Sequence, residues 1–179
     1  MNPISYWQRL KVAFQYVMPQ IYMTQAAGWL AKQKWGAVTH FVIKAFAKKY
    51  NIDMSIAEKE KFSDYASFNE FFIRPLKENA RPINQNPTAL CCPADGRVSE
   101  CGHIEDDRLL QAKGHFFSLN DLLAEDKDLT ETFKNGEFVT TYLSPRDYHR
   151  VHMPCDGTLR KMIYVPGDLF SVNPFLAKR

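Results

Sequence analysis

Two histidines three residues apart are the side chains of this 179-residue chain whose type and spacing most directly suggest chemistry. His149 and His152 lie in a polar passage, residues 144–154. On a helix this spacing would bring both imidazoles to one face, where they could bind a metal ion. Pro145 and Pro154 bracket the pair and argue against a helix. On a strand the two rings would point to opposite faces, so one ion could not bind both. No third ligand follows at a suitable spacing, and a metal site is the less favoured interpretation.

Proton transfer is the favoured interpretation of the same histidines. An imidazole exchanges a proton near neutral pH, and a neighbouring carboxylate fixes its tautomer and raises its basicity. The candidate carboxylate is Asp95, in the Pro- and Gly-containing turn at residues 92–96. Such a turn could aim Asp95 at His152. An aspartate in a tight turn can equally bond its own backbone, and on these residues alone that simpler interpretation is favoured.

Other catalytic and binding motifs are absent from the sequence. There is no phosphate-binding P-loop, no G-x-G-x-x-G and no G-x-S-x-G. The four cysteines show no paired C-x-x-C spacing, so neither a zinc ribbon nor a redox motif is indicated. Free thiols fit a reducing compartment. No nucleic-acid-binding module accompanies the basic residues, and we expect no nucleic-acid partner.

The charge is distributed unevenly along the chain. The net charge is +3, but the first acidic residue is Asp53, and seven basic residues and all three tryptophans precede it. The remainder carries sixteen basic against twenty acidic residues. Basic residues mixed with aromatic ones suit the headgroup region of a membrane, where an aromatic body is buried and its polar tip stays wet. The front of the chain is therefore a candidate for an anionic membrane surface.

Apolar residues at helical spacing predict three helices in this basic front. The first runs from Trp7 to Ile21 and is ended or kinked by Pro19; the others span about 24–33 and 36–50. Their apolar stripes either pack on the chain's own core or rest on a membrane, and both interpretations stay open. No run of 18 apolar residues occurs, which excludes a spanning helix.

A secretory signal is not indicated, because Lys11 and Gln15 interrupt any apolar run near the start of the chain. We therefore expect a peripheral protein on the cytoplasmic face of the cell membrane.

The pattern changes after the helices. Residues 51–63 form a charged connector, and Ser67 and Glu70 have the spacing of a capping box for a short helix that Pro75 stops. Beyond that, strands alternate with one helical stretch. The predicted elements are strands at 97–104 and 109–113 flanking a hairpin turn at 105–108, a helical stretch at 118–133 capped by Ser118, and strands at 138–143 and 158–165.

This layout predicts an α+β fold. N-terminal amphipathic helices precede a β-rich, mostly antiparallel domain that is incomplete at the C-terminus. We divide the chain into a helical, basic, membrane-surface region at 1–75 and a β-rich portion at 76–179.

Several passages, in collinear order, resemble the bacterial phosphatidylserine decarboxylase family. The likeness runs from the N-terminus to about Asn173, and separate motifs in the same order make coincidence a poor explanation. The passages are FNEFFIRPL at 68–76, PADG at 93–96, LQAKGH at 110–115, TTYLSPRDYHRVHMPC at 140–155 and YVPGDLFSVN at 164–173.

The resemblance implies a pyruvoyl-dependent lyase of phospholipid biosynthesis that is made as a zymogen. Such a proenzyme cuts itself at a Leu-Gly-Ser-Thr motif, the serine becomes a pyruvoyl group on a smaller α chain, and the front part remains as the β chain. Phosphatidylserine then loses CO2 through a Schiff base with the pyruvoyl carbonyl and gives phosphatidylethanolamine.

By motif match, the resemblance assigns roles to three residues. Asp95 and His152 belong to the self-cleavage triad, with His152 as general base on the serine hydroxyl. His149 is expected near the substrate carboxylate or the proton-delivery step.

The sequence departs from the family pattern because no Gly-Ser pair occurs in it, so no residue here can form the pyruvoyl group. We therefore expect a truncated proenzyme, most of a β chain, that alone neither self-cleaves nor decarboxylates. The implied partners are phosphatidylserine, an anionic membrane surface, the pyruvoyl-bearing α chain and, in a homodimer, a second copy. The alternatives are a non-catalytic module that binds membrane surfaces and, less favoured, a metal hydrolase.

Overall fold

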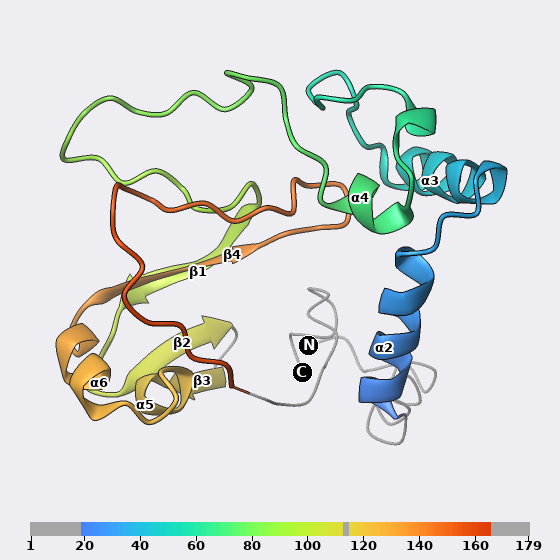
Figure 1. Ribbon diagram of the computed structural model, residues 1–179. Helices are drawn as coiled ribbons and strands as arrows, with labels where there is room; N and C mark the ends of the chain where they lie inside the picture. Colours follow the sequence, from blue (N-terminus) through green and yellow to red (C-terminus); the bar gives the residue numbers. More distant parts are fainter. Residues whose placement is uncertain (1–18, 113–114, 166–179) are drawn as a thin grey trace, which may run out of the picture.

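Helices come first along the chain and strands follow, the α+β arrangement expected from the sequence. The structure is a computed structural model that describes residues 19–112 and 115–165. In Figure 1 the helices α2, α3 and α4 lie at one side and the strands with α5 and α6 at the other, and long loops join the two sides.

The helices of the basic front begin and end close to the predicted positions. Helix α2 spans Gln20–Ala31, directly after Pro19, and α3 spans Ala37–Tyr50. Gly36 precedes α3 with a φ of 56°, a value that favours glycine. The helix predicted from Trp7 falls almost wholly outside the described residues. None of the described helices is long and apolar enough to cross a membrane.

The two helices differ in how much of their surface they bury. Helix α3 buries Thr39, Ile43 and Ala47, which stand four residues apart and so share one face. Helix α2 buries none of its residues. The core interpretation of the apolar stripes therefore holds for one face of α3 and not for α2.

A small aromatic core anchors α4, the helix at Phe68–Phe72. Phe71 and Tyr65 are fully buried against α3, beside the short 3-10 helix η1 at Phe62–Asp64. The predicted cap at Ser67 is confirmed, and the Glu70 side chain reaches back to the residue before the cap rather than to Ser67 itself. The Ser67 hydroxyl accepts a hydrogen bond from the Glu70 N–H at 3.1 Å, and the Glu70 carboxylate accepts one from the Ala66 N–H at 2.9 Å.

The strands form two antiparallel pairs. Strand β1 (Arg97–His103) pairs with β4 (Glu137–Tyr142), and β2 (Arg108–Ala112) pairs with β3 (His115–Ser118), a strand that the sequence pattern did not predict.

The predicted hairpin between strands 97–104 and 109–113 is wrong. Its turn does form, since Glu105 and Arg108 exchange backbone hydrogen bonds of 3.3 and 2.9 Å. Within this turn, however, the Asp107 carboxylate accepts hydrogen bonds from the Ser118 hydroxyl at 2.8 Å and the Asn120 N–H at 2.9 Å. These bonds hold the start of β2 against the end of β3, so β1 takes β4 as its partner instead.

The helical stretch predicted at 118–133 divides into α5 (Leu119–Leu122) and α6 (Lys127–Phe133). The predicted Ser118 cap is confirmed by a 3.2 Å bond from the Asp121 N–H. The break lies at Ala124 and Glu125, which both have a φ of 58° and cannot continue a right-handed helix.

The strand predicted at 158–165 is wrong. These residues have no regular structure, and Leu159, Met162 and Tyr164 are more than four-fifths exposed. A strand needs a neighbour for its backbone hydrogen bonds, and none of the described strands pairs with this segment.

Candidate functional site

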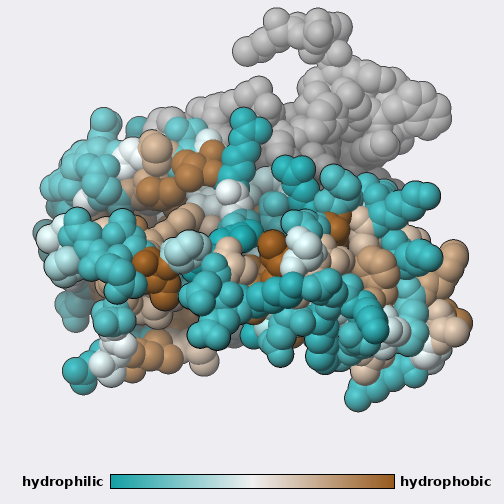
Figure 2. Space-filling view, turned by 90° about the horizontal axis from the view of Figure 1, so that it is seen from above, coloured by the Kyte–Doolittle hydropathy of each residue, from teal (hydrophilic) through white to brown (hydrophobic). Residues whose placement is uncertain are grey.

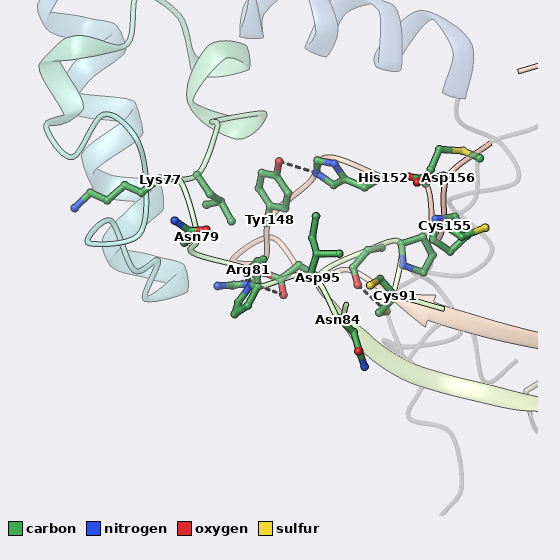
Figure 3. A pocket seen from close by; sticks show the side chains of 18 residues that line it. Lys77, Asn79, Arg81, Asn84, Cys91, Asp95, Tyr148, His152, Cys155 and Asp156 are labelled. Carbon is green, nitrogen blue, oxygen red and sulfur yellow. Dashed lines mark hydrogen bonds and ion pairs between the residues drawn. The ribbon is translucent and has the colours of Figure 1, made fainter. Parts of the chain in front are cut away.

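A pocket of about 630 Å³ contains two of the three sequence-predicted site residues, Asp95 and His152. Three segments line it: the loop within 76–84, the turn at 91–95 and the passage from Tyr148 to 156. Figure 3 shows these side chains around the cavity. Loops alone build this pocket, and residues far apart in the sequence meet there.

Backbone hydrogen bonds place the Asp95 turn beside the His152 passage. The Cys91 N–H donates to the Pro154 carbonyl at 2.8 Å, and the His152 N–H donates to the Pro93 carbonyl at 2.8 Å. These two bonds run the segments antiparallel. An isolated antiparallel bridge between Asp95 and Tyr148 adds a further connection. The two predicted residues therefore share one site through backbone contacts rather than through their own side chains.

The Asp95 carboxylate binds Arg81. It accepts hydrogen bonds from Arg81 Nε at 3.1 Å and from Nη2 at 2.6 Å, the bidentate geometry in which a guanidinium matches a carboxylate. This hydrogen bond raises the pKa of Arg81. The simpler interpretation, in which Asp95 bonds its own backbone, is not what the structure has.

The His152 ring binds Tyr148. Its Nε2 lies 2.9 Å from the Tyr148 hydroxyl, and the two rings stack at 5.5 Å with an interplanar angle of 18°. Tyr148 is only 9% exposed, whereas His152 is exposed to the pocket. The direct pairing of Asp95 with His152 stays a prediction, since each side chain has another partner here.

His149 occupies a different environment outside the pocket lining. Its ring stacks on Phe72 of α4 at 4.1 Å and 22°, and its Nε2 lies 3.0 Å from the Ser144 carbonyl oxygen. Because a carbonyl only accepts, Nε2 carries the proton and the lone pair is on Nδ1. Burial lowers the pKa of His149, which favours the neutral ring. His149 and His152 therefore have separate surroundings, and among the described residues no cluster of three or more potential ligands suits a metal ion.

Two arginines connect the helical side to the passage that carries the histidines. Arg74 is 2% exposed and donates from Nη2 to the Arg146 carbonyl at 3.2 Å, and Arg150 donates from Nε to the Ile73 carbonyl at 2.7 Å. Burial lowers the pKa of Arg74. Together with the ring stack on Phe72, these bonds set the position of His149 relative to α4.

Sequence reasoning missed Tyr148 and Arg81, which bind the side chains of His152 and Asp95. Tyr148 stands four residues before His152, inside the motif at 140–155, and this proximity was a usable signal. Arg81 stands in a Pro- and Asn-rich passage that reads only as a boundary, and its fourteen-residue separation from Asp95 gave no local signal.

Comparison with known proteins agrees with the resemblance seen in the motifs. The family model described as phosphatidylserine decarboxylase matches residues 68–179, and a second, described as PSD, matches residues 10–51. The phosphatidylserine decarboxylase proenzyme of Haemophilus influenzae strain Rd is 89% identical over 178 residues, which cover 99% of this chain and 61% of the relative. The proenzyme of Pasteurella multocida is 79% identical over 175 residues, covering 98% of this chain and 59% of that protein. The chain thus spans about three-fifths of the length of these relatives.

Proposed function

The chain belongs to the phosphatidylserine decarboxylase family, and on this premise we propose that it is the β-chain portion of a phosphatidylserine decarboxylase. The complete enzyme would convert phosphatidylserine into phosphatidylethanolamine and CO2. One observation carries the proposal: Asp95 and His152, which match the family's self-cleavage residues, line the same pocket and are held there by backbone hydrogen bonds.

The chemistry of the site fits a hydroxyl as the attacking group. His152 already places Nε2 at hydrogen-bond distance from one hydroxyl, that of Tyr148. In the proposed self-cleavage, His152 would take the proton of a serine hydroxyl, and Asp95 would orient the ring. This serine would come from the part of the complete proenzyme that the present chain does not cover. The pyruvoyl group that this serine yields would supply the carbonyl that binds the substrate amine and draws electrons as CO2 leaves.

His149 would act on the substrate side of the reaction. Burial lowers its pKa and so favours the neutral ring, whose Nδ1 lone pair can accept a proton. A neutral imidazole forms no ion pair with the substrate carboxylate, so it would not stabilise that carboxylate against the loss of CO2. We therefore propose that Nδ1 of His149 takes up a proton from solvent and passes it to the decarboxylated carbon, which returns the ring to its neutral form, and that self-cleavage depends on His152.

A chimeric proenzyme tests the proposal. This chain would be continued by the C-terminal remainder of the Haemophilus influenzae relative, and intact mass would follow its conversion into two chains. We expect cleavage of the chimera, release of CO2 from phosphatidylserine, and no cleavage when His152→Ala is introduced. His103→Ala is the matched control, because that imidazole lies on β1 and is bound to Glu137 at 3.2 Å, away from the pocket. Normal processing of the His152→Ala chimera, or turnover by the 179-residue chain alone, would contradict the proposal.

We also propose that the basic front binds an anionic membrane surface, on the cytoplasmic face of the membrane. Large apolar side chains are exposed along α2 and α3, lysines occur in the turn between the two helices and on α3, and Trp29 and Trp35 lie edge to face at 6.4 Å. Apolar patches on the described surface alternate with hydrophilic ones (Figure 2). The large apolar side chains exposed in the described part of this region, from residue 19 onward, are Ile21, Tyr22, Met23, Trp29, Leu30, Trp35, Val38, Phe41 and Val42.

Vesicle sedimentation tests the membrane proposal. We expect binding to vesicles that contain phosphatidylserine, weaker binding to neutral phosphatidylcholine vesicles, and a decrease with salt, because each lysine near an anionic leaflet contributes about 1 kcal/mol that salt screens. Phe41→Ser should weaken binding, since this side chain is 73% exposed and stabilises no core. Absence of binding to anionic vesicles would refute the proposal.

A further inference from the structure

The Tyr148 hydroxyl is the side-chain partner of the His152 ring in the pocket. It lies 2.9 Å from Nε2, and the described chain gives this hydroxyl no other hydrogen-bond partner. The aromatic ring beneath it is buried and stacks on the imidazole, so the hydroxyl has a fixed position. Figure 3 shows Tyr148 and His152 facing each other while Asp95 is turned to Arg81.

The direction of this hydrogen bond follows from the two groups. A neutral imidazole has one N–H and one nitrogen lone pair. The phenolic O–H is the more acidic donor and the imidazole lone pair the more basic acceptor, so Tyr148 donates and Nε2 accepts. The proton of His152 is then on Nδ1, because the bond made by one ring nitrogen sets the state of the other.

This tautomer is the one that a general base for a hydroxyl requires, with its lone pair on Nε2 and its N–H directed away from the nucleophile. In a triad a carboxylate normally selects it. Here the Asp95 carboxylate is engaged by two Arg81 nitrogens, so it does not select the tautomer of His152.

We propose that the Tyr148 hydroxyl is a stand-in for the attacking serine hydroxyl: it occupies His152 Nε2 and keeps the ring in its general-base tautomer until the serine replaces it. This inference rests on the proposed self-cleavage of the family. It makes Tyr148 a residue that acts on the reaction only through His152. The serine must displace the phenol from Nε2 before His152 can take its proton.

Nitrogen-15 NMR of the 179-residue chain tests the tautomer without any cleavage reaction. At about pH 8.5, where an ordinary imidazole is neutral, we expect His152 to show a protonated Nδ1 and an unprotonated Nε2. Tyr148→Phe keeps the stacked ring and removes the donor, so it should shift His152 toward a mixture of both tautomers. Tyr22→Phe is the control, because that side chain is 73% exposed on α2. A protonated Nε2 in the unaltered chain, or an unchanged tautomer in Tyr148→Phe, would overturn the inference.

The cleavage rate of the chimera gives a second, independent readout. In Tyr148→Phe the serine would no longer have to displace a neutral hydrogen bond of about 1 kcal/mol, which alone would speed cleavage about fivefold. The mixture of tautomers would leave His152 in its general-base form about half of the time, so the variant should cleave roughly two- to threefold faster than the unaltered chimera. A merely structural role of Tyr148 would slow cleavage, and an unchanged or slower rate would overturn the inference. If the unaltered chimera does not cleave, the proposed function fails, and the nitrogen spectra still decide the role of Tyr148.

Discussion

Gly96 is the position where a single added methyl group should separate the two strands next to the site. It follows Asp95 and precedes the first residue of β1. A Cβ atom at Gly96 would lie 2.5 Å from the Tyr142 carbonyl oxygen and 3.0 Å from Thr141 Cγ2. The closest neighbour is backbone in β4, so no side-chain rotation relieves the clash, and β1 must move away from β4.

The expected magnitude follows from that contact. Inserting a methyl group into an occupied space costs about 1–3 kcal/mol, so Gly96→Ala should lower the free energy of unfolding in urea by that amount. Gly102→Ala in the same strand is the matched control, because its Cβ would meet Phe138 Cε1 at an ordinary 3.5 Å. Gly28→Ala in α2 meets nothing within 4 Å and should stabilise that helix by about 1 kcal/mol.

Hydrogen exchange shows where the Gly96→Ala effect falls. We expect faster exchange for the amides that pair β1 with β4 and unchanged exchange in α3. Since Asp95 is the neighbouring residue, the chimera carrying Gly96→Ala should also self-cleave more slowly. Equal stability of Gly96→Ala and Gly102→Ala would refute the steric reasoning.

Three further predictions concern the supports of the site. Ser67→Ala removes the cap of α4 and should lower the free energy of unfolding by about 1 kcal/mol in urea, whereas exposed Ser63→Ala should change it by less than about 0.5 kcal/mol. Burial lowers the pKa of His149, so below pH 6.5, the ordinary imidazole pKa, the folded chain binds fewer protons than the unfolded chain. The free energy of unfolding that is due to the neutral ring is therefore fully present above pH 6.5. It is lost as the pH falls from 6.5 toward the lowered pKa of the folded state. The urea concentration at the unfolding midpoint should thus decrease as the pH is lowered below 6.5, and His149→Gln should make this decrease smaller. An unchanged pH dependence of the midpoint in His149→Gln would contradict the burial argument. Arg150→Gln removes the hydrogen bond to the Ile73 carbonyl, so the passage that carries the histidines should be held less tightly against α4. We expect limited proteolysis to cut that passage faster in the variant.

The sequence predicted those elements whose determinants are local. Ser67 and Ser118 cap the helices that they were expected to cap, and the helix after Gly36 begins one residue from the predicted position. Each of these signals needs only the few residues next to it, since a cap bonds an N–H two or three positions further along. Apart from the break that divides the stretch at 118–133, the elements that were wrongly predicted are strands. Whether a strand forms, and with which partner, depends on distant segments: β1 pairs with β4, about forty residues away, rather than with the strand across its own turn.

The candidate site divides in the same way. The motifs identified Asp95 and His152, but neither motif contained the information that the two segments run antiparallel. That arrangement depends on bonds such as the one from the Cys91 N–H to the Pro154 carbonyl, between residues more than sixty positions apart. The partners of the two side chains differ in how well the sequence could predict them. Tyr148 stands only four residues before His152, whereas Arg81 reaches Asp95 only because the loop between them folds back.

The contacts in the pocket fall into two classes of strength, and this difference bears on how the site could be completed. The backbone of Asp95 and His152 is fixed by paired segments and by the close approach at Gly96, which cannot change without separating strands. Their side chains are held more weakly. The partly exposed Asp95–Arg81 ion pair is of a kind worth about 0–1 kcal/mol, and the neutral bond from Tyr148 is worth about 1 kcal/mol. A third group that offered His152 a better hydrogen bond could therefore exchange these partners without moving the backbone. In this view the chain supplies a rigid frame with replaceable side-chain pairings, which is what a site that must accept a hydroxyl from another segment requires.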